Sequence, residues 1–308
     1  MIDLHTHSTV SDGSESPGRI CELAAEAGCS AVALTDHDSL AGLPDAQASA
    51  TRLGVELVPG CEVSCAYSSG SMHVLVYFVE DPGSPLGEEL ARLRQDRLTR
   101  NRRLADRLAD LGLPITYEAL VERAGGEAGL GRPHVAALLV DIGAADSIQD
   151  AFDRWLGAGR PAYVPKARIT APEVARLARD SSAVAVLAHP LSLGLAPGEL
   201  AATVRELAGA GFGGIEAIYG RYSPEERGML EDLAAESSLV ATGGSDFHGS
   251  FKPDLSVGTG RGDLEVPDSV VEDLAARRRT TARRRTAAGL APGMTQPETM
   301  PMGRLAGD

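Results

Sequence analysis

Cysteine is scarce, and long apolar runs are absent. The four cysteines lack the paired spacing of a zinc finger or ribbon, which argues against a zinc module and against a disulfide framework. We interpret them as reduced thiols. The N-terminus has no basic start followed by an apolar stretch, and no apolar run is long enough to cross a bilayer. We therefore expect a cytoplasmic protein without a membrane partner.

Basic residues are fewer than acidic residues. The 308 residues include 29 Lys+Arg against 43 Asp+Glu, which gives a net charge of −14. Wrapping of duplex DNA requires neutralisation of many phosphates, so we expect no duplex DNA partner. A small anionic substrate must then be held locally, and metal ions could reverse the local field. Only two of the basic residues are lysines, Lys166 and Lys252.

The hydrophobic pattern predicts an α/β fold. At 43% apolar residues, the chain can bury a sizeable core. In residues 1–83, short strand-like runs alternate with helical patterns, which indicates βα units and a parallel sheet. The same alternation returns in residues 168–262. The predicted strands are 1–7, 31–35, 55–58, 73–79, 184–188, 214–218 and 239–242.

Two segments depart from this alternation. Residues 84–167 are rich in Arg and Leu, with helical spacing and no convincing strand, and they predict a helical insertion. In residues 263–308 we expect a last helix and then a disordered basic tail. The arginine triplets 277–279 and 283–285 could touch RNA, although a solvated tail is the commoner meaning.

The positions of the histidines carry the strongest functional signal. Nearly all seven lie at or beside the ends of predicted strands, close to a carboxylate, glycine or proline, as expected for a site at one end of a barrel. His5 and His7 are two residues apart, so on a strand both side chains leave the same face. Asp246 and His248 repeat this spacing, and Glu62 has two oxygens with which to bridge two ions.

Nine residues form the candidate ligand set. One ion takes about four to six protein and water ligands, so nine indicate two or three divalent ions. A mixed histidine and carboxylate set without thiolate favours manganese, with iron or zinc as alternatives. The nine are His5, His7, Asp12, His37, Glu62, His73, His189, Asp246 and His248.

Simpler interpretations exist for several carboxylates. Asp12 lies in a turn-like Ser-Asp-Gly sequence and would serve there as a turn or cap residue. Asp36 and Asp38 flank His37, and we interpret both as N-cap residues of the helix that follows.

The chain resembles the PHP (polymerase and histidinol phosphatase) domain family. The resemblance spans roughly residues 1–258 and implies a distorted (β/α)7 barrel with two or three bound ions. Successive family motifs are matched in order by His5-Thr6-His7-Ser8 with Ser11-Asp12-Gly13, Thr35-Asp36-His37, Gly60-Cys61-Glu62, Met72-His73, Ala188-His189-Pro190 and Gly244-Ser245-Asp246-Phe247-His248.

The resemblance also implies how the ligands are shared. The first ion would be held by His5, His7, Glu62 and Asp246. The second would share Glu62 and add His73 and His189. The third would be held by Asp12, His37 and His248. Histidinol phosphate phosphatases commonly carry a histidine where this chain has Asp12, so that activity is less expected.

Two segments of the insertion are Arg100-Asn101-Arg102-Arg103 and Gly131-Arg132-Pro133-His134. They resemble the substrate-binding segments of PHP enzymes that act on nucleoside 3′,5′-bisphosphates, which implies that the insertion binds substrate. Relatives of that group also trim short RNAs from the 5′ end. Arg132 offers a planar fork suited to phosphate oxygens, and His134 can donate a further hydrogen bond. We assign catalytic roles to Glu62, Arg132 and His134. The substrate-binding candidates are Asp12, His37, Arg100, Asn101, Arg102, Arg132, His134 and Lys166, of which Arg100, Arg102 and Lys166 could instead be solvated surface residues.

These observations predict a metal-dependent phosphatase of small nucleotides. The most favoured reaction is removal of the 3′-phosphate from nucleoside 3′,5′-bisphosphates, with 5′-3′ exonuclease activity on short single-stranded RNA as an extension. The alternatives are a histidinol-phosphate or cyclic-nucleotide phosphoesterase, hydrolysis of a C–N bond, and a non-catalytic metal-binding PHP module.

Overall fold

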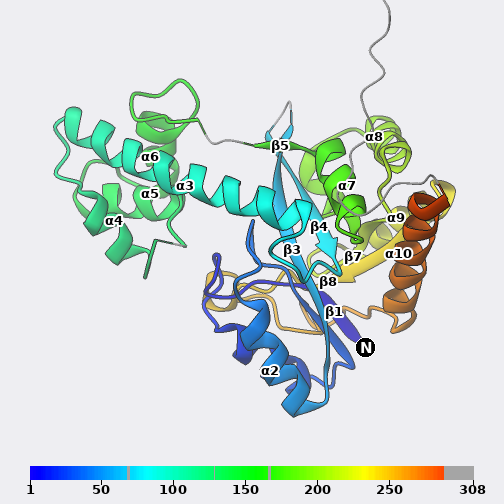
Figure 1. The fold of residues 1–308 in the computed structure, drawn as a ribbon. Helices are drawn as coiled ribbons and strands as arrows, with labels where there is room; N and C mark the ends of the chain where they lie inside the picture. The colour runs from blue at the N-terminus through cyan, green and yellow to red at the C-terminus, as the bar shows by residue number, and fades with distance from the viewer. Residues whose placement is uncertain (68–69, 128, 166–167, 288–308) are drawn as a thin grey trace, which may run out of the picture.

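One eight-stranded sheet forms the centre of the molecule. The computed structural model describes residues 1–67, 70–127, 129–165 and 168–287. Seven strands follow one another in the order β1-β2-β3-β4-β6-β7-β8, and the short β5 pairs with β3 (Figure 1). The strands are β1 (Ile2–Thr6), β2 (Ala31–Leu34), β3 (Glu56–Tyr67), β4 (Gly70–Tyr77), β5 (Ile169–Thr170), β6 (Val184–Leu187), β7 (Gly214–Tyr219) and β8 (Val240–Gly244).

The sheet closes on itself at its first and last strands. The Asp246 amide donates to the His5 carbonyl at 2.8 Å, and the His7 amide donates to the Phe247 carbonyl at 2.9 Å. These bonds join β1 to the residues that follow β8. The seven strands therefore form a nearly closed barrel, which confirms the predicted distorted α/β barrel.

The direction of β4 differs from the prediction of a parallel sheet. It runs antiparallel to both β3 and β6, whereas the other neighbouring strands of the barrel are parallel. Consecutive strands with a short connection pair as an antiparallel hairpin, because a parallel pair needs a crossover of a dozen or more residues. The local strand pattern alone does not distinguish these two pairings.

Strand β3 is also longer than predicted. We expected a strand over residues 55–58 that ends before Pro59 and Gly60, but β3 continues to Tyr67. The strand changes partner at this point, pairing with β2 up to Pro59 and with β4 from Gly60 onwards. Consequently Glu62 and His73 lie within strands, not at strand ends as predicted.

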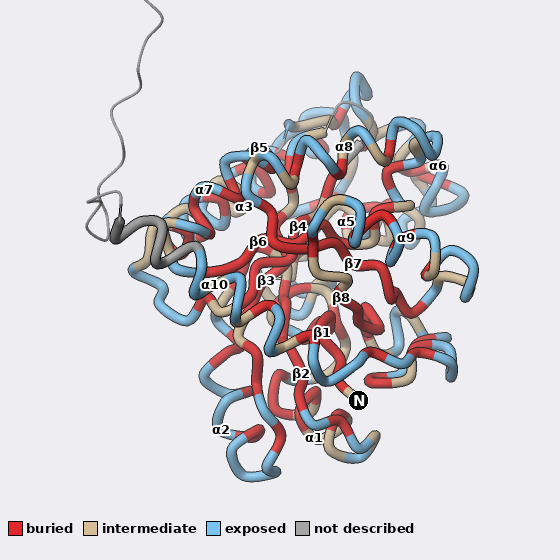
Figure 2. The backbone as a smooth tube through the Cα atoms, turned by 90° about the vertical axis from the view of Figure 1, so that its right-hand side faces the viewer, coloured by how far each residue is buried: buried red, intermediate tan, exposed pale blue. Residues whose placement is uncertain are grey.

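Helices surround the barrel and cover its buried strands (Figure 2). Helix α1 begins after Ser16, whose hydroxyl accepts the Arg19 amide, and it ends just before Gly28, whose φ of +78° suits glycine. The helices outside the insertion are α1 (Pro17–Glu26), α2 (Leu43–Leu53), α7 (Ala171–Asp180), η2 (Pro190–Leu193), α8 (Pro197–Ala210), α9 (Pro224–Glu236), η3 (Gly249–Phe251) and α10 (Ser269–Ala287).

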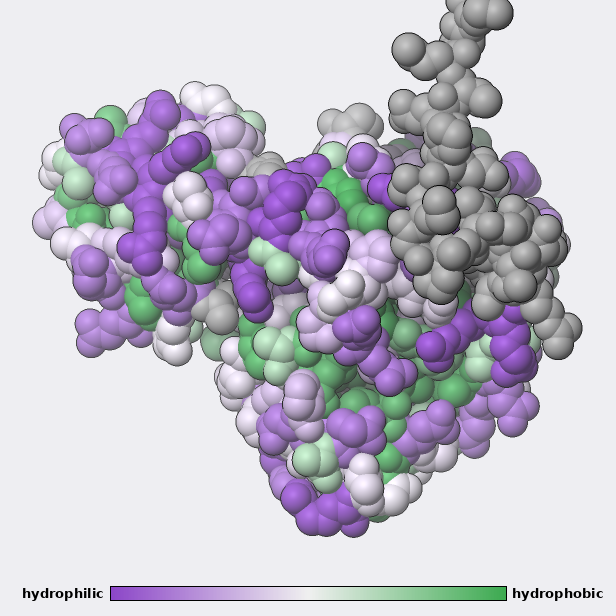
Figure 3. All heavy atoms as spheres, viewed as in Figure 1, coloured by the Kyte–Doolittle hydropathy of each residue, from purple (hydrophilic) through white to green (hydrophobic). Residues whose placement is uncertain are grey.

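The predicted helical insertion forms a lobe beside the barrel (Figure 1). Its long helix α3 packs Leu86 and Leu90 into the barrel core and Leu104 and Leu108 into a second core within the lobe. The visible face of the lobe is largely hydrophilic (Figure 3). Divisions of the chain after residues 83, 167 and 262 stay predictions. The lobe contains α3 (Pro85–Asp110), α4 (Tyr117–Arg123), α5 (Arg132–Asp141), α6 (Ile148–Ala151) and the π-helix η1 (Phe152–Leu156).

Helix α10 contains both arginine triplets. Arg278 donates to the Ser182 carbonyl at 2.8 Å, just after the end of α7. Residues 288–308, where we expected a disordered tail, lie outside the described residues. None of the helices in the described ranges has the length and apolar character needed to cross a membrane. The cytoplasmic location stays a prediction.

Candidate functional site

All nine predicted ligand residues meet at one end of the barrel. Two come from β1 and the residue after it, two from within β3 and β4, and the others from the segments that follow β1, β2, β6 and β8. His189 and Asp246 both have positive φ, 26° and 56°. Such backbone is costly for residues other than glycine and is typical of functional sites. It turns both side chains towards the same centre.

Glu62 lies at the middle of this cluster and is buried. Its Oε2 is 3.3, 3.2 and 3.2 Å from ring nitrogens of His5, His7 and His37, respectively. Its Oε1 is 3.0 Å from ring nitrogens of both His73 and His189. The two oxygens of one carboxylate therefore face two different groups of histidines.

Asp246 forms a second centre of contacts. Its Oδ1 lies 3.5, 3.4 and 3.3 Å from ring nitrogens of His5, His7 and His248, respectively. Its Oδ2 accepts from the Tyr219 hydroxyl at 2.7 Å and from the Lys252 ammonium at 2.5 Å. One oxygen thus faces the histidines while the other is fixed from the opposite side.

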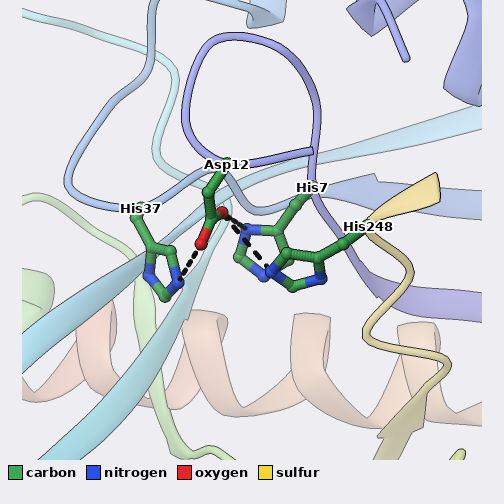
Figure 4. A group of neighbouring side chains, drawn as sticks. All are labelled: His7, Asp12, His37 and His248. Atoms are coloured by element: carbon green, nitrogen blue, oxygen red, sulfur yellow. Dashed lines mark ion pairs between the residues drawn. The ribbon is translucent and has the colours of Figure 1, made fainter. Parts of the chain in front are cut away.

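Asp12 connects three histidines on the outer side of the cluster (Figure 4). Its Oδ1 is 3.6 Å from His7 Nδ1 and 3.4 Å from His248 Nε2, and its Oδ2 is 3.6 Å from His37 Nε2. The Asp12 side chain is 45% exposed, in contrast to Glu62. This part of the cluster is therefore the most accessible from solvent.

These residues fit divalent metal ions. His5 Nε2 and His7 Nε2 are only 3.1 Å apart, a spacing that suits two nitrogens directed at one cation. Asp12 Oδ1, His37 Nδ1 and His73 Nδ1 are buried and form no hydrogen bond, although carboxylates or imidazoles lie nearby. Buried polar atoms are rarely left without a partner, and a bound ion would supply one. Donor atoms within 4.8 Å of one another occur in three groups: His7, Asp12, His37 and His248; His5, His7 and Asp246; and His37, Glu62 and His73.

The histidines of the metal-free protein differ in pKa because their electrostatic surroundings differ. Burial would lower the pKa of His7, but Asp246 and Glu62 outweigh it and raise the pKa to about 9. Burial lowers the pKa of His37 to about 4, because the nearby carboxylates only partly compensate. The carboxylate of Glu62 is buried, yet the histidines around it hold its pKa well below the usual range. Glu62 is thus ionised at the centre of the cluster, as a ligand of a cation must be.

The sequence did not reveal Glu216, which supports the cluster from behind. It is buried in β7, where its Oε1 lies 2.8 Å from His5 Nδ1 and its Oε2 accepts the His189 amide at 2.7 Å. The sequence signal that could have identified it is a single carboxylate within an apolar, entirely buried strand, because a buried carboxylate requires hydrogen-bond partners. Contact with Nδ1 leaves His5 Nε2 directed at the cluster.

We expect Glu216→Gln to weaken metal binding about 10- to 100-fold, as loss of a carboxylate that orients a metal-bound histidine typically does. Titration calorimetry of the metal-free protein with Mn²⁺ would measure this change. Glu231→Gln, an exposed position on α9, is the control. An unchanged affinity in Glu216→Gln would contradict a role in orienting His5.

The two aspartates beside His37 are not helix caps as predicted, because the residue that precedes α2 is Gly42. Instead, Asp36 accepts hydrogen bonds from the Ser8 amide at 2.8 Å and from the Ser11 hydroxyl at 2.6 Å. Asp38 accepts the Ser64 amide at 3.0 Å. Asp36 therefore fixes the loop after β1, and Asp38 connects the segment after β2 to strand β3.

A cavity of about 1250 Å³ lies over the ligand cluster. Residues of α4 and α5, including Arg123 and His134, form one wall. The segments after β6, β7 and β8 contribute the others. Gly131 donates its amide to His134 Nδ1 at 3.3 Å, which leaves Nε2 available. Burial lowers the pKa of His134, so the ring is neutral near pH 7.

The remaining substrate-binding candidates occupy different environments. Arg100 is only 7% exposed, and its Nε and Nη1 form no hydrogen bond. Burial and the nearby Arg132 lower its pKa to about 10. Asn101 is buried and donates to the Leu130 carbonyl at 2.9 Å, while its Oδ1 lacks a partner. Arg102 is 58% exposed and forms an ion pair with Glu127 at 2.7 Å. The cavity lining does not include Arg100, Asn101, Arg102 or Arg132, but Arg132 directly precedes Pro133, which does line it. Lys166 lies outside the described residues.

Comparisons with known proteins agree with this architecture. The PHP domain model matches residues 3–108. The 5′-3′ exoribonuclease Rnm of Salmonella typhimurium is 33% identical over 80% of this chain and 85% of its own length. The 3′,5′-nucleoside bisphosphate phosphatase of Chromobacterium violaceum is 30% identical over 83% of this chain and 90% of its own length.

A solved structure from Bifidobacterium adolescentis, provisionally assigned as a metal-dependent phosphoesterase, matches with a TM-score of 0.73. It is 30% identical and covers 90% of this chain and 96% of its own. The similarity extends over both barrel segments and the insertion. By its barrel, its cluster of potential metal ligands and these relatives, the chain belongs to the PHP domain family and is a metal-dependent phosphoric ester hydrolase.

Proposed function

We propose that this enzyme removes the 3′-phosphate of nucleoside 3′,5′-bisphosphates and, by the same bond cleavage, releases nucleotides from the 5′ end of short RNAs. The observation that carries this proposal is the buried guanidinium of Arg100, which lies near Arg132 and whose Nε and Nη1 form no hydrogen bond. Two neighbouring arginines without a carboxylate partner for Arg100 suit an anion. A substrate with one phosphate at the ligand cluster and another at these arginines satisfies both sites.

The ligand cluster would hold two or three divalent ions, and manganese is our first choice, with iron or zinc as alternatives. When bound, such ions lower the pKa of water from about 15.7 towards about 7 and stabilise charge on phosphoryl oxygens. We assign the three sites as follows: His5, His7, Glu62 and Asp246 to the first; Glu62, His73 and His189 to the second; and Asp12, His37 and His248 to the third.

The protein's own groups would position the substrate. Arg132 and Arg100 bind the 5′-phosphate, and Asn101 Oδ1 is free to accept from the same nucleotide. His134 Nε2 donates to an oxygen of the 3′-phosphate above the cluster. Asp12 and His37 line the cavity and would bind this phosphate group through the third ion, to which both are assigned. Water then attacks phosphorus, the bond from phosphorus to O3′ breaks, and O3′ takes up a proton.

The experiment measures phosphate release by manganese-loaded protein from adenosine 3′,5′-bisphosphate, histidinol phosphate and 5′-AMP, and conversion of a cyclic nucleotide to its monophosphate. We expect the bisphosphate to have the highest kcat/KM, because only it occupies both anion sites. Preference for histidinol phosphate or for the cyclic nucleotide would replace this proposal with the corresponding alternative. The named activities of the relatives argue against a non-catalytic module.

Arg132→Ala should lower kcat/KM for adenosine 3′,5′-bisphosphate about 10- to 100-fold, since a charge-assisted hydrogen bond contributes about 1.5–3 kcal/mol. The loss should be much smaller for 3′-AMP, which lacks the second phosphate. Arg154→Ala, at an exposed position of the same lobe, is the matched control. Equal losses for both nucleotides, or altered metal content, would show that Arg132 does not recognise the 5′-phosphate.

A further inference from the structure

One apolar ring at the cavity is largely exposed. Phe251 is 65% exposed, more than the other exposed large hydrophobic residues of the described chain. Those residues lie elsewhere on the surface, whereas Phe251 lines the cavity over the ligand cluster. A large exposed apolar group at a binding cavity is a candidate contact for a ligand.

The backbone that presents this ring is fixed on both sides. The Ser250 amide donates to the Ser14 hydroxyl at 3.0 Å. The following residue, Lys252, donates through Nζ to Asp246 Oδ2 at 2.5 Å and through its amide to the Gly249 carbonyl at 3.1 Å. Phe251 is thus held outward by an anchored segment, and a preorganised surface loses little entropy when a ligand binds.

Two basic side chains, Lys252 and Arg221, line the cavity together with Phe251, in a chain with a net charge of −14. The Lys252 ammonium is already paired with the Asp246 carboxylate at 2.5 Å. Arg221 and Arg261 both pair with the single carboxylate of Asp254, at 2.7 and 2.9 Å, so one positive charge is left over. The Glu226 carboxylate also lines the cavity, but it accepts the Ser223 amide at the start of α9.

The chemistry of the proposed reaction requires space beyond the first nucleotide. In a short RNA, the phosphate attached to O3′ of the first nucleotide also carries O5′ of the second. When water attacks this phosphorus and the bond to O3′ breaks, O3′ is protonated and the phosphate stays on the second nucleotide. If the first 5′-phosphate is bound at Arg132, at the start of α5, the second nucleotide would have to use another wall of the cavity.

We propose that Phe251, with Lys252 and Arg221, forms the subsite for this second nucleotide. The base stacks on the exposed ring, and the cations face the next phosphate. This combination of an aromatic platform and positive charge is how proteins hold single-stranded nucleic acid without reading its sequence. This proposal rests on the proposed function. The subsite would bind substrates of two or more nucleotides and would stay unused by a single nucleotide.

The test compares kcat/KM for a 5′-phosphorylated RNA trinucleotide and for adenosine 3′,5′-bisphosphate. We expect Phe251→Ala to lower the ratio of kcat/KM for the trinucleotide to kcat/KM for the bisphosphate about tenfold or more. Stacking of one base has an effect of this size. Phe251→Trp, which keeps a stacking surface, should restore the ratio. Met229→Ala removes an exposed apolar side chain from α9, away from the cavity, and is the control.

Each outcome has a distinct meaning. A ratio that falls in Phe251→Ala and recovers in Phe251→Trp supports the subsite. Equal losses for both substrates would place Phe251 against the first nucleotide, and an unchanged ratio would show no contact with RNA; either result overturns the inference. If the wild-type protein hydrolyses the bisphosphate but not the trinucleotide, the inference fails while the phosphatase function stands. If it hydrolyses neither substrate, the proposed function itself fails.

Discussion

Glu62→Gln should lower kcat/KM for phosphate esters by about 10³-fold, the largest loss we expect from a single substitution. The side chain keeps its size, so the change removes only the negative charge at the centre of the ligand cluster. Metal ions contribute several kcal/mol of transition-state stabilisation, and each 1.4 kcal/mol corresponds to about a tenfold change in rate. Metal content after dialysis against Mn²⁺ should fall together with activity.

The reason lies in the position of Glu62. One oxygen faces His5, His7 and His37, and the other faces His73 and His189. A neutral amide would present an NH₂ group to one of these two groups of imidazoles, where it cannot act as a metal ligand. The substitution therefore affects two proposed metal sites, in contrast to substitution of a residue that serves only one.

Glu56→Gln is the matched control for this experiment. Glu56 lies at the start of the same strand but is exposed, away from the ligand cluster. We expect its metal content and activity to equal those of the wild type. Full metal content with normal turnover in Glu62→Gln would contradict a bridging role for Glu62. Loss of folded protein, detected by circular dichroism, would indicate a mainly structural role.

The candidate ligands could be predicted from sequence because most of them follow strands. His37, His189 and Asp246 come directly after or close to short buried strands, where a barrel brings distant segments together. The position of a histidine or carboxylate after a strand is a local feature, so it can be predicted from a single sequence. Glu62 and His73 have the same chemistry but lie within strands, and they were identified by residue type while their positions within the strands were mispredicted.

The supporting residues could not be found in this way. Glu216 lies in mid-strand, and its role depends on His5, which is 211 residues away in the chain. Tyr219 and Lys252 both fix Asp246, and neither forms a motif with it. Contacts between distant residues decide these supporting roles. The antiparallel direction of β4 has a different origin: β3 continues to Tyr67, so only a short connection separates it from β4, and the predicted end of β3 at Val58 concealed this hairpin.

The stability of the metal-free protein should depend strongly on pH above neutrality. In the unfolded chain, histidine has a pKa of about 6.5, whereas His7 in the folded protein has a pKa raised to about 9. The stabilisation from protonated His7 is therefore fully present below about pH 6.5 and is lost as pH rises towards 9. His37, whose pKa is lowered to about 4, acts in the opposite direction and only below pH 6.5.

Metal ions compete with protons for the same ring nitrogens, so the saturated protein should not lose stability over this range. We therefore expect the difference in Tm between protein with excess Mn²⁺ and protein with EDTA to grow between pH 6.5 and 9. The raised pKa of His7 corresponds to about 3 kcal/mol in the free energy of unfolding, and a change of this size moves Tm by roughly 5–10 °C. Thermal unfolding followed by circular dichroism at several pH values measures it.

His134→Gln is the control for this titration, because that residue lies outside the ligand cluster and should leave the pH-dependent difference in place. His7→Gln should reduce the growth of the difference, since the proton that stabilises the metal-free form is then absent. A difference in Tm that stays constant from pH 6.5 to 9 would show that the histidines near Glu62 and Asp246 are not protonated without metal. In that case the negative charge at the centre of the cluster would have to be balanced from another direction, and Lys252 at Asp246 would be the first residue to substitute.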